Sequence, residues 1–222
     1  MININVKKDR QDIDNVAIET QKMIVDIESV FNKKLNFELL INIHDTRDQY
    51  DKTLNRKTFD WEVGNTNKNR IDILHPNSFE KYSSHKKEEF LPTLKHELVH
   101  VYLNQLIRDK IIPLWLNEGI ANFVSGQVDK YREANMYIEE DFLKKISSEA
   151  GWSQYSGGCV YVYSALFIDY IANKYSFEKV ILLVLKARKN YYFEEFNVAF
   201  KEIFGIKLED VEKDFIGYLN NN

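Results

Sequence analysis

The sequence predicts an α+β fold, with a small sheet-bearing N-terminal lobe followed by a mostly helical C-terminal lobe. Two observations support this prediction. The first third of the chain mixes short β-prone runs with one helical pattern, whereas apolar residues recur at helical spacing from about residue 87 to the end. We therefore expect a single domain, residues 1–222, made of an α/β lobe, 1–86, and a helical lobe, 87–222.

In the first lobe we expect one helix and three strands. Apolar residues at helical spacing predict a helix within residues 10–33, and residues 36–43 form a β-prone run. Residues 58–63 and Arg70–Leu74 suggest a hairpin around the polar turn Gly64-Asn65-Thr66-Asn67. Pro76 ends the second of these strands, because proline cannot donate to a ladder.

In the second lobe the apolar spacing predicts successive helices. Pro113 suits a first helical turn, Ser176 suits an N-cap, and Gly205 suits the position just after a helix. The expected helices span residues 87–109, 113–126, 129–148, 158–175, 177–189, 193–204 and 208–220.

Composition excludes several classes of function. The net charge is −4 and no Lys/Arg tract is present, so we expect no nucleic-acid partner. The lone Cys159 cannot form an intrachain disulfide, and we expect a small buried or half-buried residue rather than a nucleophile. The polar N-terminus lacks a signal-peptide core, and no apolar run is long enough to span a bilayer. A cytoplasmic protein that does not bind membranes is expected, and its oligomeric state is not indicated.

Residues 96–100 read His-Glu-Leu-Val-His, and helical geometry brings the two histidines together. Positions four apart on an α-helix share one face in adjacent turns, so His96 and His100 point the same way. Two imidazoles in this arrangement can bind one zinc ion. Glu97 lies beside that face, where its carboxylate can act on a metal-bound water. Chance alone gives roughly 0.01 matches to this motif at this composition.

The remaining residues of this helix agree with that orientation. With His96 set at 0°, the apolar residues fall between about 140° and 240° around the axis. We therefore expect the helix to pack on its back and to present the histidines to a cleft. These residues are Leu91, Leu94, Leu98, Val101 and Tyr102. The alternative is a coincidental motif on a helix with two solvated histidines.

A third ligand is expected from the next helix, a largely apolar segment that carries one carboxylate, Glu118. Three protein ligands plus a water give the open coordination of catalytic zinc. A carboxylate among apolar neighbours is costly unless it is paired or metal-bound. We expect His96, His100 and Glu118 to hold one zinc ion per chain, with an exposed residue or an ion pair as the alternative for Glu118.

Taken together, His-Glu-Leu-Val-His at 96–100 and Trp-Leu-Asn-Glu-Gly-Ile-Ala at 115–121 resemble the peptidase MA-like gluzincins. The chain is also similar to thermolysin and to zinc aminopeptidases that share Asn-Glu-Gly, over about residues 70–220. The resemblance implies a zincin-like domain with zinc on His96, His100 and Glu118, and a cleft between its lobes. It further implies that Glu97 acts as general base while a zinc-activated water hydrolyses a peptide bond in a peptide or protein substrate.

The resemblance continues through residues 161–175 and the following Ser-Phe-Glu-Lys, where Ser176 stands in place of the family's usual Gly. In related aminopeptidases a tyrosine upstream in this segment stabilises the oxyanion. Alignment assigns that role to Tyr161, with Tyr163 as the alternative.

Other residues are compared with the same enzymes. Asn122 lies where thermolysin-like enzymes place an Asp on a ligand histidine, and Asn104 lies one turn after His100; we expect both to be plain helix-surface residues. We expect His75 and His85 not to be ligands. The strand Arg70–Leu74 resembles the edge strand along which related enzymes lay an extended substrate, with an ordinary sheet edge as the alternative.

Two departures bear on the activity. The aminopeptidase segment Gly-Ala-Met-Glu-Asn is absent, so we expect an endopeptidase, and no histidine follows His100 as one does in thermolysin. One alternative function is a catalytically inactive zinc-binding pseudo-peptidase that serves as an interaction or regulatory module. A second is a regulatory protease devoted to one cellular protein.

Overall fold

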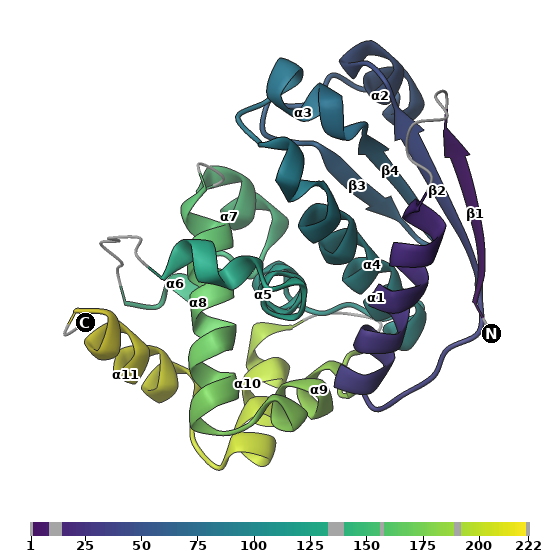
Figure 1. Cartoon of the computed structure of the whole chain (residues 1–222). Helices are drawn as coiled ribbons and strands as arrows, with labels where there is room; N and C mark the ends of the chain where they lie inside the picture. The colour runs from purple at the N-terminus through teal and green to yellow at the C-terminus, as the bar shows by residue number, and fades with distance from the viewer. Residues whose placement is uncertain (1, 9–14, 133–139, 156–157, 189–191, 221–222) are drawn as a thin grey trace. The chain divides into compact units, whose positions relative to one another are not determined.

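The computed structural model describes residues 2–8, 15–132, 140–155, 158–188 and 192–220, and it confirms the predicted α+β class. The chain divides into two compact units, residues 1–105 and 106–222. Within the described residues, the first unit contains all four strands and the second is mainly helical (Figure 1).

The first unit is built on a mixed sheet with strand order β1-β2-β4-β3. Strands β1 (Asn3–Lys8), β2 (Glu38–His44) and β4 (Arg70–Leu74) are parallel, whereas β3 (Gly64–Asn67) pairs antiparallel with β4. Side chains alternate across a strand, so the odd-numbered apolar residues of β2 and β4 share one face. Helices α1 (Val16–Val30) and α4 (Phe90–Ile107) lie along this face (Figure 1). Its buried residues are Leu39, Ile41, Ile43, Ile71 and Ile73.

Short helices connect the strands of this unit. Helix α2 (Arg47–Leu54) begins at a capping box in which the Thr46 hydroxyl accepts from the Gln49 N–H, so an otherwise unpaired donor is satisfied. Helix α3 (Pro76–Tyr82) follows β4, and the 3₁₀ turn η1 (Lys87–Glu89) leads into α4. The segment 56–63 is fixed from one side by the Arg47 guanidinium. Arg47 donates to the Thr58 hydroxyl and to the carbonyls of Phe59, Asp60, Glu62 and Tyr82.

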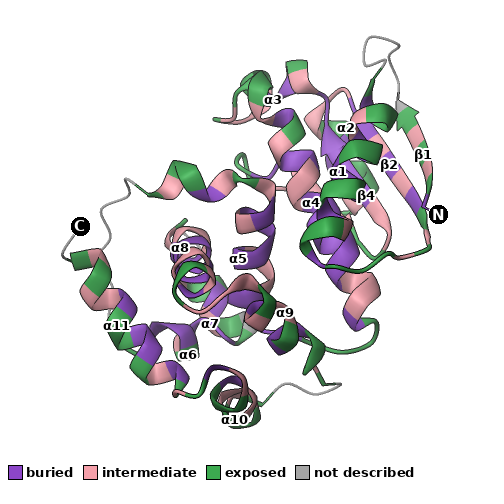
Figure 2. Ribbon diagram, turned by 60° about the horizontal axis from the view of Figure 1, so that its bottom comes forward, coloured by how far each residue is buried: buried purple, intermediate pink, exposed green. Residues whose placement is uncertain are grey.

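The second unit is a helical assembly with an aromatic core. Large side chains of α5, α8 and the later helices are fully buried there and meet edge to face, an arrangement that aromatic rings favour. Helix α11 shows the expected split, with buried and exposed residues on opposite sides (Figure 2). The core rings include Trp115, Tyr163, Phe167, Phe200 and Phe215. The helices are α5 (Leu114–Ser125), η2 (Gln127–Tyr131), α6 (Phe142–Lys145), α7 (Glu149–Gln154), α8 (Cys159–Lys174), α9 (Phe177–Leu185), α10 (Phe193–Phe204) and α11 (Leu208–Asn220).

The predicted hairpin is wrong in the positions of its first strand and its turn. The predicted turn 64–67 is itself the strand β3, residues 58–63 form no strand, and the chain reverses at Lys68-Asn69 instead. Lys68 has a φ of 57° there. The predicted edge strand is also wrong, because Arg70–Leu74 pairs on both sides and β3 forms the edge. Strand β1, which lies in a polar segment, was not predicted.

The helical predictions succeed where the apolar pattern is long. Helices α5, α8, α10 and α11 agree with their expected spans to within a residue or so, and Gly205 ends α10 with a φ of 79°. The single helix expected over 129–148 is wrong, since its described parts hold the end of η2 and the four-residue α6. Parts of three expected helices, residues 10–14, 133–139 and 189, lie outside the described residues.

Two observations concern the compositional predictions. No helix among the described residues is long and apolar enough to cross a membrane. Cys159 is half-buried at the start of α8, where its thiol donates to the Tyr155 carbonyl at 3.2 Å. This contact is the structural role expected of a lone cysteine.

Candidate active site

Helix α4 places both histidines of the motif in adjacent turns of one face. Their Nε2 atoms lie 3.0 Å apart and their ring planes are inclined by 80°. The opposite side of the helix is fixed in the core, since Leu94, Leu98 and Val101 are each at most 2% exposed. Leu91 differs from its expected place in this stripe, because it lies in the first turn and is 39% exposed.

The donor pair fits a tetrahedral metal ion. Two nitrogens each about 2.0–2.1 Å from a tetrahedral zinc would lie about 3.3–3.4 Å apart, close to the 3.0 Å between His96 Nε2 and His100 Nε2. The helix fixes the separation of the two backbones, and the rotamers of the two side chains bring their Nε2 atoms together. This pair of imidazoles therefore has the chemistry and spacing of half a zinc site.

Glu97 is enclosed by the edge strand. Its side chain is 7% exposed, and Thr66 of β3 donates its hydroxyl to Glu97 Oε2 at 2.6 Å. The same hydroxyl lies 3.0 Å from the Glu97 carbonyl oxygen. The negative charge of Glu97 contributes, after burial itself, to raising the pKa of the neighbouring Tyr50. Glu97 is therefore a fixed carboxylate in a largely dry environment.

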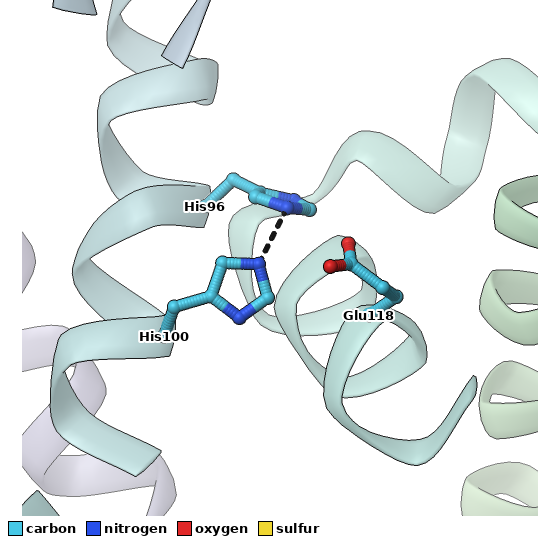
Figure 3. A group of neighbouring side chains, drawn as sticks. All are labelled: His96, His100 and Glu118. Carbon is cyan, nitrogen blue, oxygen red and sulfur yellow. Dashed lines mark hydrogen bonds between the residues drawn. The ribbon is translucent and has the colours of Figure 1, made fainter. Parts of the chain in front are cut away.

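Glu118 occupies the second turn of α5. Pro113 precedes this helix and Gly126 ends it with a φ of 79°, as the sequence predicts for a helix over these residues. Glu118 is half-buried, and one ligand atom each from His96, His100 and Glu118 all lie within 4.8 Å of one another (Figure 3). Two imidazole nitrogens and one carboxylate oxygen are the donor set of many catalytic zinc sites.

The position after Glu118 is glycine because atoms of α8 lie where a side chain would begin. A Cβ at this position would lie 2.5 Å from the carbonyl oxygen of Ser164 and 2.4 Å from the side chain of Ile168, both on α8. Glycine therefore allows α5 to approach α8 more closely than any other residue would. The backbone of α5 beside Glu118 is fixed by this contact.

A family described as BSP, peptidase of plants and bacteria, matches residues 61–215. The match covers more than half of the 222 residues and includes β3, α4, α5 and α8. The chain belongs to this peptidase family. No curated protein matches it. Membership of a family named as a peptidase supports the expectation of a hydrolase-type enzyme.

In this peptidase the two candidate tyrosines of α8 have different surroundings. Tyr163 is fully buried and donates its hydroxyl to Glu212 Oε1 at 2.9 Å, and burial together with the Glu212 charge raises its pKa. Tyr161 is half-buried and packs edge to face against Trp152. Of the two, only Tyr161 keeps part of its side chain accessible.

Other predicted residues of the peptidase have structural contacts. His75 Nδ1 accepts from the Asn77 N–H and caps α3. His85 contacts Glu89 Oε2 at 2.5 Å and the Trp61 carbonyl at 3.1 Å. Asn122 is 1% exposed and donates to the Glu118 carbonyl, so the expectation of a surface residue is wrong. Asn104 is half-buried.

Sequence reasoning did not find the residues that surround Glu97. Thr66 was assigned to a turn, and Gly64 was assigned to the start of that turn. A Cβ on Gly64 would lie 2.8 Å from Glu97 Oε1, so this glycine is needed for close approach and not for a bend. The sequence offered one indication of this contact, namely Gly64 followed two residues later by Thr66, shortly before the β-prone run 70–74.

Proposed function

We propose that this peptidase is a zinc-dependent enzyme of the gluzincin type, with the zinc on His96, His100 and Glu118. The observation that supports the proposal is the approach of one donor atom from each of these residues to within 4.8 Å of the others. The 3.0 Å separation of the two Nε2 atoms adds to it, because it is close to the nitrogen separation of a tetrahedral site.

The residues of the chain then have defined roles. Bound Zn²⁺ would supply Lewis acidity, which lowers the pKa of a bound water and polarises a carbonyl. Glu97 accepts a proton from the attacking water and passes it to the leaving amine. The low exposure of Glu97 strengthens its electrostatic interactions, because few water molecules screen it.

Substrate alignment is assigned to the edge strand β3. In an antiparallel pair, alternate residues direct their backbone N–H and C=O groups toward the partner strand. Val63 bonds to Leu74 on β4, so the backbone groups of Gly64 and Thr66 point to the open edge. An extended peptide can add to such an edge through its main chain, which requires no free terminus. We therefore propose endopeptidase activity on peptide or protein substrates.

Tyr161 is the proposed donor to the oxyanion. Tyr163 is fully buried and donates its hydroxyl to Glu212, whereas Tyr161 is only half-buried. A single oxyanion donor contributes about 10²–10³ in turnover in a well-studied protease. We expect Tyr161→Phe to lower kcat with no loss of zinc, and a wild-type rate would exclude this role.

The decisive experiment measures zinc content and peptide-library cleavage on the same preparations. Glu97→Gln should keep its zinc and lose about 100-fold or more in turnover, because only the base is removed. Glu118→Ala should weaken zinc binding by more than about 100-fold, since even the loss of a residue that only hydrogen-bonds a metal ligand costs about 10–100-fold. Glu88→Gln, an exposed change in η1, is the matched control and should alter neither quantity.

The outcomes separate the alternatives. Wild-type protein that carries zinc yet cleaves no peptide would favour the inactive pseudo-peptidase. Protein that carries no metal after purification without chelators would favour a coincidental motif. Unchanged zinc affinity in Glu118→Ala would remove that residue from the ligand set.

A further inference from the structure

The carboxylate of Glu97 is held by two features of one strand. Thr66 donates its hydroxyl to Glu97 Oε2 at 2.6 Å, a short distance typical of a hydrogen bond to a charged acceptor. Gly64 lies two residues earlier on the same face of β3. A Cβ at this position would lie 2.8 Å from Glu97 Oε1 and 3.0 Å from its Cγ, so the absence of a side chain leaves room for the carboxylate. The two oxygens of the carboxylate thus face different residues of β3.

We propose that Thr66 and Gly64 are positioning residues for the general base, an inference that rests on the proposed role of Glu97. The Thr66 hydroxyl fixes Oε2, and the absent side chain of Gly64 sets how far Oε1 can approach the strand. The edge strand that aligns the substrate would thereby also set the orientation of the base. Both residues would act through Glu97.

The residue types suit this role. A carboxylate offers about four lone-pair sites, so accepting one bond from Thr66 leaves the remaining sites free for a water and its proton. A β-branched threonine has few rotamers and favours a strand, so its hydroxyl is held in place at little entropic cost. The same hydroxyl lies 3.0 Å from the Glu97 carbonyl oxygen, which is a second acceptor for its single proton.

The first test compares Thr66→Val, which removes the hydroxyl at nearly constant shape, with Thr66→Ser, which keeps it. A hydrogen bond to a charged group corresponds to a rate change of about 10- to 100-fold. We expect kcat to fall by about 10- to 100-fold in Thr66→Val with KM nearly unchanged. Thr66→Ser should retain most of the wild-type kcat. Thr53→Val, on the exposed side of α2, is the matched control and should retain wild-type kinetics.

A double-mutant cycle separates positioning from general damage. Because Thr66 acts through Glu97, Thr66→Val should cause no further loss of turnover in a Glu97→Gln background, whereas independent damage would multiply the two losses. Zinc affinity should be the same in wild type, Thr66→Val and Thr66→Ser. Equal turnover in wild type and Thr66→Val, or multiplicative losses, would overturn the inference.

A measurement without metal or substrate checks the contact itself. Urea unfolding of metal-free protein is compared for Thr66→Val in the wild-type background and in Glu97→Leu, which cannot accept the bond. The unfolding equilibrium constant should rise about tenfold or more in the first background and much less in the second. If wild type proves inactive but this coupling is present, the proposed function fails and the contact stands. If wild type is active and the coupling is absent, the inference fails alone.

Gly64→Ala tests the second half of the inference. The added Cβ would meet the far end of a flexible side chain, so the carboxylate must move while the strand can stay in place. We expect turnover to fall by about tenfold or more with a change of only a few degrees in Tm. Gly217→Ala, whose Cβ would meet nothing, is the control. Unchanged turnover in Gly64→Ala would refute the role of this glycine.

Discussion

Replacement of Gly119 by alanine tests how the helix that carries Glu118 is fixed. The new Cβ would lie 2.5 Å from the Ser164 carbonyl oxygen, whereas ordinary contacts begin at 3.4 Å. The shortfall, 3.4 − 2.5 Å, is 0.9 Å. Because the obstacle is a backbone atom, no rotamer change can relieve it, and α5 must move away from α8.

The expected loss of stability follows from two opposing terms. Overpacking a well-filled contact costs about 1–3 kcal/mol. Alanine in a helix interior recovers up to about 1 kcal/mol relative to glycine, because glycine loses more backbone entropy on folding. Because the Ser164 carbonyl cannot rotate away, we take the overpacking cost at the upper end of its range, about 2–3 kcal/mol, and the net loss is then about 1–2 kcal/mol. For a protein of 150–250 residues each kcal/mol shifts Tm by about 2–4 °C, so Tm should fall by about 2–8 °C.

Thermal unfolding followed by circular dichroism measures this shift on metal-free protein. Gly217→Ala is the matched control, since it adds the same methyl group to α11 in open space and should raise Tm slightly. A Gly119→Ala protein that melts within a degree of wild type would refute the close-approach argument. Under the proposed function the shift of α5 should also weaken zinc binding, because metal–ligand distances tolerate only about 0.2 Å.

Three further changes have defined expectations. Ser176 adopts a φ of 132°, a region that favours glycine, so Ser176→Gly should stabilise the protein by about 1 kcal/mol in urea unfolding, and a loss of stability would contradict this. Burial raises the pKa of Glu212 above its ordinary value of 4.5, so its contribution to stability is present below that value and is lost as pH rises above it. Glu212→Gln should therefore gain stability relative to wild type as pH rises from 4.5, and a constant difference would count against the shift. Arg47→Lys should lower Tm by several degrees, because one ammonium cannot reproduce the guanidinium's bonds to the segment 56–63, and an unchanged Tm would show that those bonds contribute little.

The sequence was most informative where structure depends on local spacing. The helices that carry His96, His100 and Glu118 follow from apolar periodicity and from end signals such as Pro113 and Gly126. The placement of the two histidines on one face is likewise a local property of any helix with this four-residue spacing. Binding of zinc by these residues and the gluzincin type stay predictions, whereas the fold class and membership of a peptidase family are confirmed.

The sequence was least informative where structure depends on pairing between distant segments. Strand β1 is rich in asparagine and lysine, and it becomes a strand because it pairs in parallel with β2, some 35 residues later. Thr66 and Glu97 are separated by 31 positions, and no local pattern links them. The edge strand was misplaced for the same reason, since only the sheet order shows which strand has an open side.

Glycine has two structural roles in this chain, and confusing them caused Gly64 to be assigned to a turn. Gly126 and Gly205 have positive φ and end helices, which is the role that sequence rules assign to glycine first. Gly64 and Gly119 lie within a strand and a helix, and each is required because another group occupies the place of its Cβ. Gly64 makes room for the carboxylate of Glu97, whereas Gly119 makes room for α8 beside Glu118. A glycine next to a candidate catalytic carboxylate is therefore better tested as a site of close approach before it is assigned to a turn.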